Sequence, residues 1–153
     1  MRRKRLIALV IVAVVVFLAV SAVLARVWSG DGAEQSAVTT LVGEEARGDA
    51  AAMIATMYRC STSPSCRARA DADAATLKRA GTVSVLQYQT STGFSLSTTN
   101  GSGRVAWEIV GRTRPIVQCV RVRRAGNAIS GIHIELLAIT LRLKSGATCP
   151  THF

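Results

Sequence analysis

One uninterrupted apolar run near the N-terminus constrains this chain more than any other feature. The run LIALVIVAVVVFLAVSAVLA, Leu6 to Ala25, contains no charged residue. In a helix this run rises about 30 Å, which matches the hydrocarbon thickness of a bilayer. The sequence therefore predicts a transmembrane helix over residues 6–25.

The charges beside this run predict its orientation. Residues 1–5, MRRKR, are almost all basic, and the positive-inside rule places such a flank in the cytoplasm. We therefore expect a single-pass protein whose residues 26–153 lie outside the cytoplasm. A cleaved signal peptide, cut near Ser21 or Ala25, is the alternative, although a signal h-region is usually only about 7–15 residues long. Both interpretations export the rest of the chain.

The exported part is expected to be a short linker followed by one domain. Residues 26–35 contain the polar stretch VWSGDGAEQ and are interpreted as the linker, which leaves residues 36–153 for one compact domain. Without the N-terminal flank, 15 Lys and Arg remain against 9 Asp and Glu. This basic balance suits anionic polymers or lipid headgroups. Nucleic acid is not expected as a partner, because the domain is exported and carries no recognition motif.

The cysteines of an exported domain predict two disulfides. Pairing Cys60 with Cys66 and Cys119 with Cys149 is preferred among the three possibilities, because Pro64 and the serines of the first loop let the chain turn back. Zinc would require closer spacing and a second clustered pair, and a thioredoxin-like site would require Cys-x-x-Cys. No cofactor or metal is therefore expected.

The first half of the domain has the apolar spacing of helices. In the first helix an apolar stripe lies opposite Glu44 and Glu45, which are expected on the other side. Gly48 and Asp49 end this helix and cap the next. The third helix is Ala-rich and is expected at the surface. The predicted helices span residues 36–47, 50–58 and 67–81.

The second half alternates with the period of two that is typical of strands. The stretch TTNGSG, residues 98–103, is interpreted as a hairpin turn. Helices followed by an antiparallel meander indicate the α+β class, with two or three helices packed on a curved antiparallel sheet. The predicted strands begin at Val83, include Phe94 and Leu96, cover residues 105–110, and continue through IVQCVRVRR, ISGIHIELL and AITLRLK.

The order of elements is an anchor, a helix, the break at RGD, two more helices and a curled sheet. GRVAWEIV (103–110), PIVQCVRVRR (115–124) and ISGIHIELLAI (129–139) stand in this order as consecutive strands. Over residues 36–149 the chain thereby resembles the nuclear-transport-factor-two-like superfamily, the cystatin-like α+β cone, in its small membrane-anchored actinobacterial form. Members include enzymes, ligand binders and structural envelope domains, so the resemblance leaves the function open.

Four residues are candidates for lining a cavity in such a cone. Trp107 shares the phase of the apolar residues of its strand, as a core residue does. Gln118 alternates with apolar neighbours, so we expect a buried polar group that needs a partner. The four candidates are Tyr88, Phe94, Trp107 and Gln118.

Two further groups of polar residues are candidate sites. His133 and Glu135 share one face of a strand, but the opposite face is apolar, so both are expected to point to solvent rather than to form an acid–base pair. A group of arginines flanks the strand PIVQCV. These arginines are interpreted as a patch for an anionic polymer, a lipid headgroup or an acidic partner, or alternatively as a solvated strand edge. They are Arg112, Arg114, Arg121, Arg123 and Arg124.

The sequence contains no nucleophile elbow, phosphate loop or paired-carboxylate motif. We therefore expect a non-enzymatic domain at a bacterial cell membrane that binds or scaffolds in an envelope assembly, with envelope proteins or an anionic polymer as partners. The oligomeric state stays open. The alternative is a small-molecule binder or enzyme that uses the cone cavity. An open pocket with Gln118 or Tyr88 on its wall would favour that alternative.

Overall fold

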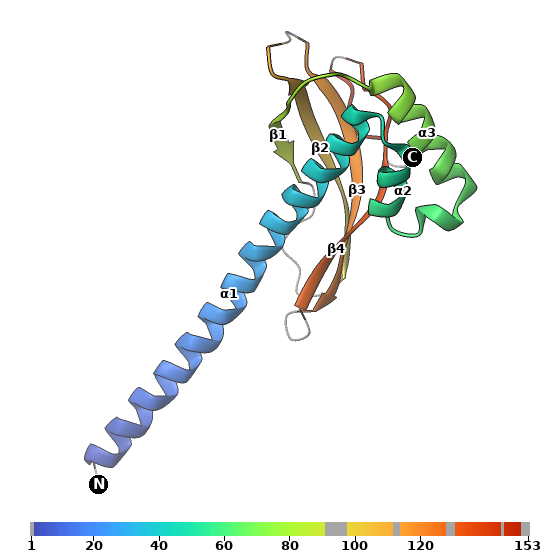
Figure 1. Ribbon diagram of the computed structural model, residues 1–153. Helices are drawn as coiled ribbons and strands as arrows, with labels where there is room; N and C mark the ends of the chain where they lie inside the picture. Colours follow the sequence, from blue (N-terminus) through green and yellow to red (C-terminus); the bar gives the residue numbers. More distant parts are fainter. Residues whose placement is uncertain (1, 91–97, 112–113, 128–130, 145, 151–153) are drawn as a thin grey trace.

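The computed structural model describes residues 2–90, 98–111, 114–127, 131–144 and 146–150. Within these residues, four helices precede one four-stranded antiparallel sheet with the order β1-β2-β3-β4 (Figure 1). The predicted α+β class is therefore confirmed. The elements are α1 (Arg2–Arg47), α2 (Ala50–Thr56), the 3-10 helix η1 (Cys60–Thr62), α3 (Pro64–Leu77), β1 (Val83–Gln89), β2 (Thr99–Ile109), β3 (Ile116–Asn127) and β4 (Gly131–Ile139).

Helix α1 is 46 residues long and continues from the apolar run into the domain without a break. Its segment Leu6–Ala25 is long and apolar enough to cross a membrane, and the side chains there are largely exposed. Helix α1 runs without a break through residues 26–35, the segment predicted as a linker. Gly30 and Gly32 weaken the local helix propensity, but Glu34 is buried against the sheet, and such tertiary packing stabilises the helix.

The predicted break between the first two helices is confirmed. Helix α1 ends at Arg47, and Gly48 has φ of +74°, in the left-handed region that favours glycine. The Oδ1 atom of Asp49 then accepts a hydrogen bond from the Ala52 backbone N–H over 2.9 Å and caps α2. The chain therefore turns back, and α2 and α3 pack beside α1.

Helix α3 lies at the surface, as expected from its composition, and buries one face against the rest of the domain. Ala70, Asp73, Ala74 and Leu77 are buried, and the other residues of the helix are exposed or half-buried. The small alanine side chains let α3 approach α1 and α2 closely, so a helix with few large apolar residues still contributes to the core.

The sheet differs from the sequence prediction at two places. Residues 99–103 form the start of β2 and pair with residues 120–124 of β3 instead of forming a hairpin turn. These cross-strand hydrogen bonds satisfy backbone groups that a turn would leave to solvent. The predicted strand AITLRLK is also wrong beyond Ile139. Thr140 N and Leu143 N donate to Cys119 O and Val117 O, and the chain between them leaves the regular ladder. The predicted strand at Phe94 and Leu96 lies outside the described residues.

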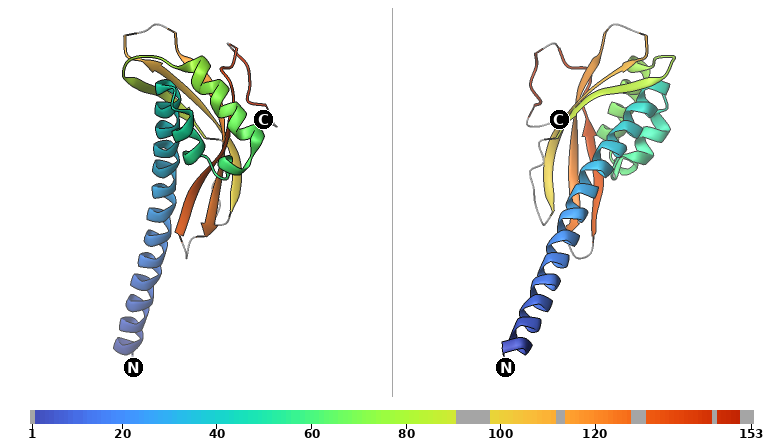
Figure 2. Two further views of the ribbon diagram at one scale, coloured as in Figure 1. Left: turned by 45° about the vertical axis from the view of Figure 1, so that its right-hand side comes forward. Right: turned by 90° about the vertical axis from the view of Figure 1, so that its left-hand side faces the viewer.

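The two disulfides join the cysteines as predicted. Cys60 and Cys66 tie η1 to the first turn of α3, with their Cα atoms 5.2 Å apart. Cys119 and Cys149, with Cα atoms 5.6 Å apart, tie the C-terminal segment to β3. In the right-hand view of Figure 2 this segment lies on the side of the sheet away from α2 and α3.

Alternation along the strands gives the sheet two different sides. The helix-facing side carries apolar residues that pack on the helices, and the outward side carries mainly polar residues. On β2 and β3 the helix-facing residues include Val105, Trp107, Ile109, Ile116, Gln118, Val120 and Val122, and the outward residues include Ser102, Arg104, Ala106, Val117, Arg121 and Arg123.

Candidate functional site

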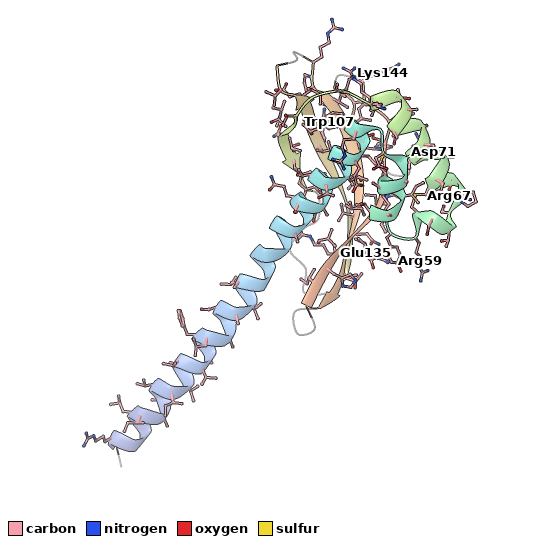
Figure 3. All side chains as sticks on the ribbon, in the orientation of Figure 1. Arg59, Arg67, Asp71, Trp107, Glu135 and Lys144 are labelled. Atoms are coloured by element: carbon pink, nitrogen blue, oxygen red, sulfur yellow. A yellow bond between two sulfur atoms is a disulfide. The ribbon has the colours of Figure 1, made fainter. Side chains whose placement is uncertain are left out.

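Trp107 (labelled in Figure 3) and Gln118 are diagonal neighbours on β2 and β3 on the helix-facing side, and both are fully buried. Trp107 Nε1 donates to Gln118 Oε1 over 2.6 Å. Gln118 Nε2 donates to Glu45 Oε1 over 2.7 Å and to the Thr140 carbonyl over 2.9 Å. The predictions that Trp107 is a core residue and that Gln118 is a buried group with a partner are confirmed.

Glu45 connects this network to α1. The sequence placed Glu45 opposite the apolar stripe, but its side chain is fully buried. Burial raises the pKa of Glu45 from 4.5 to about 8, the hydrogen bond from Gln118 acts in the opposite direction, and the nearby Asp73 carboxyl raises it further. The Glu45 carboxyl is therefore largely protonated at neutral pH.

Asp73, on α3, brings a second buried carboxyl close to Glu45. Burial raises the pKa of Asp73 from 3.8 to about 6, against the lowering effect of the Arg69 guanidinium. Within the described residues, neither oxygen of Asp73 nor Oε2 of Glu45 has a hydrogen-bond partner. The other unexpectedly buried acid, Glu44, accepts a hydrogen bond from Thr56 Oγ1 over 2.9 Å. The carboxyls of Glu45 and Asp73 can hold protons, but they are closed off from solvent.

The hollows lined by described residues include three, and none of these three is lined by Trp107, Gln118, Glu45 or Asp73. One of about 230 Å³ separates α3 from β4 and includes Arg69. One of about 300 Å³ lies on the outward side, and one of about 360 Å³ lies beside Tyr58. Tyr88, Trp107 and Gln118 line none of the three. Trp107 and Gln118 instead belong to a packed interior.

Tyr88, itself half-buried, belongs to a second polar group, which we call the Glu34 cluster and which consists of Glu34, Tyr88 and Arg124. The Tyr88 hydroxyl donates to Glu34 Oε1 over 2.5 Å, and Arg124 Nε donates to Glu34 Oε2 over 2.7 Å. Burial, followed by the hydrogen bond with Glu34, raises the pKa of Tyr88. The cluster joins α1 to β1 and β3 at the base of the domain.

The five arginines predicted as one patch are separated by the structure. Arg124 points to the helix-facing side and is buried in the Glu34 cluster, so its assignment to a surface patch is wrong. Arg121 and Arg123 lie on the outward side, because residues of one strand alternate between its two sides. Arg114 is exposed in the connection between β2 and β3, and Arg112 lies outside the described residues, as does Phe94.

The pair His133 and Glu135 is only partly as expected. His133 is exposed on the outward side, with 66% of its side chain accessible, whereas only 12% of the Glu135 side chain is accessible. Glu135 is covered because it forms an ion pair with Arg123, its cross-strand neighbour. The Arg123 and Arg59 guanidinium groups lie 4.7 Å and 5.2 Å from the centre of the Tyr58 ring. Glu135 is thus held in a surface ion pair.

The hollow on the outward side involves residues that the sequence did not single out. It is lined by Gln87 and Gln89 of β1, by Arg104 and Ala106 of β2, and by Val117 of β3. Cross-strand register brings these residues together, with Gln87 opposite Ala106 and Gln89 opposite Arg104. The alternation in the sequence indicates that each lies on the polar side of its strand, but it does not indicate the register.

Comparison with known proteins provides no relative. No protein-family model, no curated protein and no solved structure matches the chain. What the structure shows is the α+β class, with an apolar N-terminal helix and an open four-stranded sheet.

Proposed function

We propose that this protein is a single-pass membrane protein whose extracytoplasmic domain binds or scaffolds partners in a bacterial envelope assembly and catalyses no reaction. The observation that carries this proposal is the continuity of α1 from the apolar segment into the domain core. A helix shared by the membrane and the core gives the domain a defined orientation at the membrane surface. A scaffold needs such an orientation, because it presents the same face to its partners each time.

The packing of α1 supports this rigid attachment. Val38, Leu41 and Val42 are at most 1% exposed and belong to the core. Two polar connections reinforce them, one through the Glu34 cluster and one from Glu45 to Gln118. Movement of the sheet relative to α1 would leave these buried polar groups without partners, which is costly. The domain and the helix therefore move as one body.

Two further observations support the proposed location and class. Two disulfides are typical of a domain in an oxidising compartment, outside the cytoplasm. An enzyme or small-molecule binder of this fold would use the interior, but here that interior is filled by the side chains of Trp107 and Gln118, which are hydrogen-bonded to each other. The actinobacterial nuclear-transport-factor-two-like cone belongs to the same proposal, supported by the order of the helices and strands.

The first test is the intact mass of the protein taken from native membranes, alkylated with and without prior reduction. The proposal expects the full-length mass, with four cysteines labelled only after reduction. The mass of a shorter chain that begins between residues 21 and 26 would overturn the anchoring.

The second test places a photo-crosslinking amino acid at Leu86 on β1 or at Asp71 on α3, both exposed positions on different faces. The proposal expects discrete adducts with envelope components in intact cells. If neither position gives an adduct above the level of unirradiated cells, the scaffolding role is contradicted.

A further inference from the structure

We propose that the hollow on the outward side of the sheet binds an acidic glycan, a chain of sugar units that carry carboxylates. This inference rests on the proposed function, because such a polymer reaches the hollow only if the domain lies outside the cytoplasm. Arg104 would bind the carboxylate, and Gln87 and Gln89 would bind neighbouring hydroxyl groups.

The shape of the hollow follows from the register of three strands. Ala106 of β2 lies between Gln87 of β1 and Val117 of β3, and its small side chain forms the floor. The hollow measures about 300 Å³, at the lower end of the range of about 300–1,000 Å³ for small-ligand sites. A short segment of a polymer fits such a space better than a bulky ligand does.

The chemistry of the lining suits an acidic sugar. Within the described residues Arg104 has no ion-pair partner, and a guanidinium binds a carboxylate through two parallel hydrogen bonds. The amides of Gln87 and Gln89 each offer donors and an acceptor, as sugar hydroxyls require. An apolar pocket of the kind that anchors a peptide side chain is not part of this lining, which makes an acidic peptide a poorer fit.

The distribution of charge favours a polyanion on the outward side. Four of the nine acidic residues are buried on the helix side of the molecule, whereas Arg124 is the only basic residue that is buried among those described. The accessible surface is consequently more basic than the composition alone suggests, and it raises the local concentration of an anionic polymer. The four buried acids are Glu34, Glu44, Glu45 and Asp73.

The height of the hollow argues against a lipid headgroup as the ligand. Tyr88, between Gln87 and Gln89, is bonded to Glu34, nine residues after Ala25 on α1. Nine helical residues rise about 14 Å, and each headgroup layer is only about 5–8 Å thick. A typical tilt of about 20° changes this height little. The hollow therefore lies above the headgroups, where a polymer of the envelope is within reach.

The test measures binding of trigalacturonate to the full chain in detergent micelles by calorimetry. The methyl ester of the same trisaccharide serves as the uncharged ligand. We expect Arg104→Gln to weaken binding of the acid by about tenfold or more, since a charge-assisted hydrogen bond is lost. Ala106→Leu should abolish binding without changing the charge. Arg114→Gln, which removes a charge elsewhere on the surface, should change the affinity less than about twofold.

Equal binding of the acid and the ester would overturn the site, as would equal effects of Arg104→Gln and Arg114→Gln. The site would also be overturned if Arg104→Gln lost binding to vesicles rich in phosphatidylglycerol but still bound the trisaccharide. The unfolding temperature of each variant is compared with that of the wild type, so that a folding defect is distinguished from a loss of binding. If trisaccharide binding fails but crosslinks still form in cells, the glycan site is contradicted and the scaffolding role stands. If crosslinks are absent but the trisaccharide still binds, the scaffolding role is contradicted and the glycan site stands.

Discussion

Arg124 on β3 and Glu34 on α1 are 90 residues apart in sequence and form a buried ion pair, with Nε 2.7 Å from Oε2. The two side chains are 10% and 1% exposed. Glu34 stands only nine positions beyond the apolar run, so the pair ties the sheet directly to the continuation of the apolar helix. This contact places Glu34, which belongs to the segment predicted as a linker, within the packed domain.

Removal of Arg124 should therefore destabilise the domain strongly. Arg124→Ala leaves the Glu34 carboxylate buried without its cation, and the expected loss is about 3–5 kcal/mol of unfolding free energy. Urea unfolding followed by circular dichroism measures this loss. Arg114→Ala, at an exposed position, is the matched control and should stay within about 0.5 kcal/mol of wild type. Equal stability of the two variants would show that the pair does not hold α1 to the sheet.

The raised pKa of Glu45 predicts that the domain becomes less stable as pH rises. The folded state keeps a proton that the unfolded chain releases above its pKa of 4.5, so stability declines from about pH 4.5 to about pH 8. Asp73 acts in the same direction, but only up to about pH 6. Between pH 6.5 and 7.5 the expected loss from Glu45 is on the order of 1 kcal/mol.

Glu45→Gln tests this pH dependence, because Gln keeps an oxygen that accepts the hydrogen bond from Gln118. The unfolding free energy of this variant should be nearly constant between pH 6.5 and 7.5. Glu108→Gln, on the outward side, should keep the slope of the wild type. A Glu45→Gln variant with an unchanged slope would mean that Glu45 is not the titrating group.

Substitutions at Gly32 test whether α1 is continuous. A Cβ at this position meets no atom within 4 Å, so Gly32→Ala should stabilise the helix by about 0.5–1 kcal/mol. Gly32→Pro removes a backbone donor and should cost about 3 kcal/mol. Thermal unfolding in micelles, together with the far-ultraviolet helix signal, measures both effects. If residues 26–35 were a flexible linker, both variants would behave like wild type.

The two disulfides should contribute unequally to stability. Cys119 and Cys149 are separated by 30 residues and Cys60 and Cys66 by 6. The chain-entropy relation then predicts losses of just under about 4 and about 2 kcal/mol for the two double-alanine variants. Chemical unfolding of each variant against wild type measures the difference. The opposite order would indicate that the C-terminal segment adds little to the folded state.

The sequence predictions that depend on short-range interactions were correct, and several of those that depend on contacts between distant segments were wrong. Gly48 and Asp49 were correctly placed at a helix break, because left-handed backbone and capping are local properties. Gln118 was correctly expected to be buried, since its apolar neighbours alternate with it. The hairpin turn at residues 98–103 was wrong, because pairing with β3 outweighs the local turn propensity. The site residue Arg104 was missed, since its neighbours come from the register of two other strands.

By itself, the sequence determined the apolar helix, the α+β order of elements and the disulfide cysteines. Each of these depends on composition or on short-range periodicity. Only the tertiary structure decided that α1 continues through residues 26–35, that Glu45 and Asp73 share the interior, and that Arg124 faces inward while Arg121 and Arg123 face outward. These features depend on contacts between residues far apart in the chain, where burial and cross-strand register outweigh local propensity.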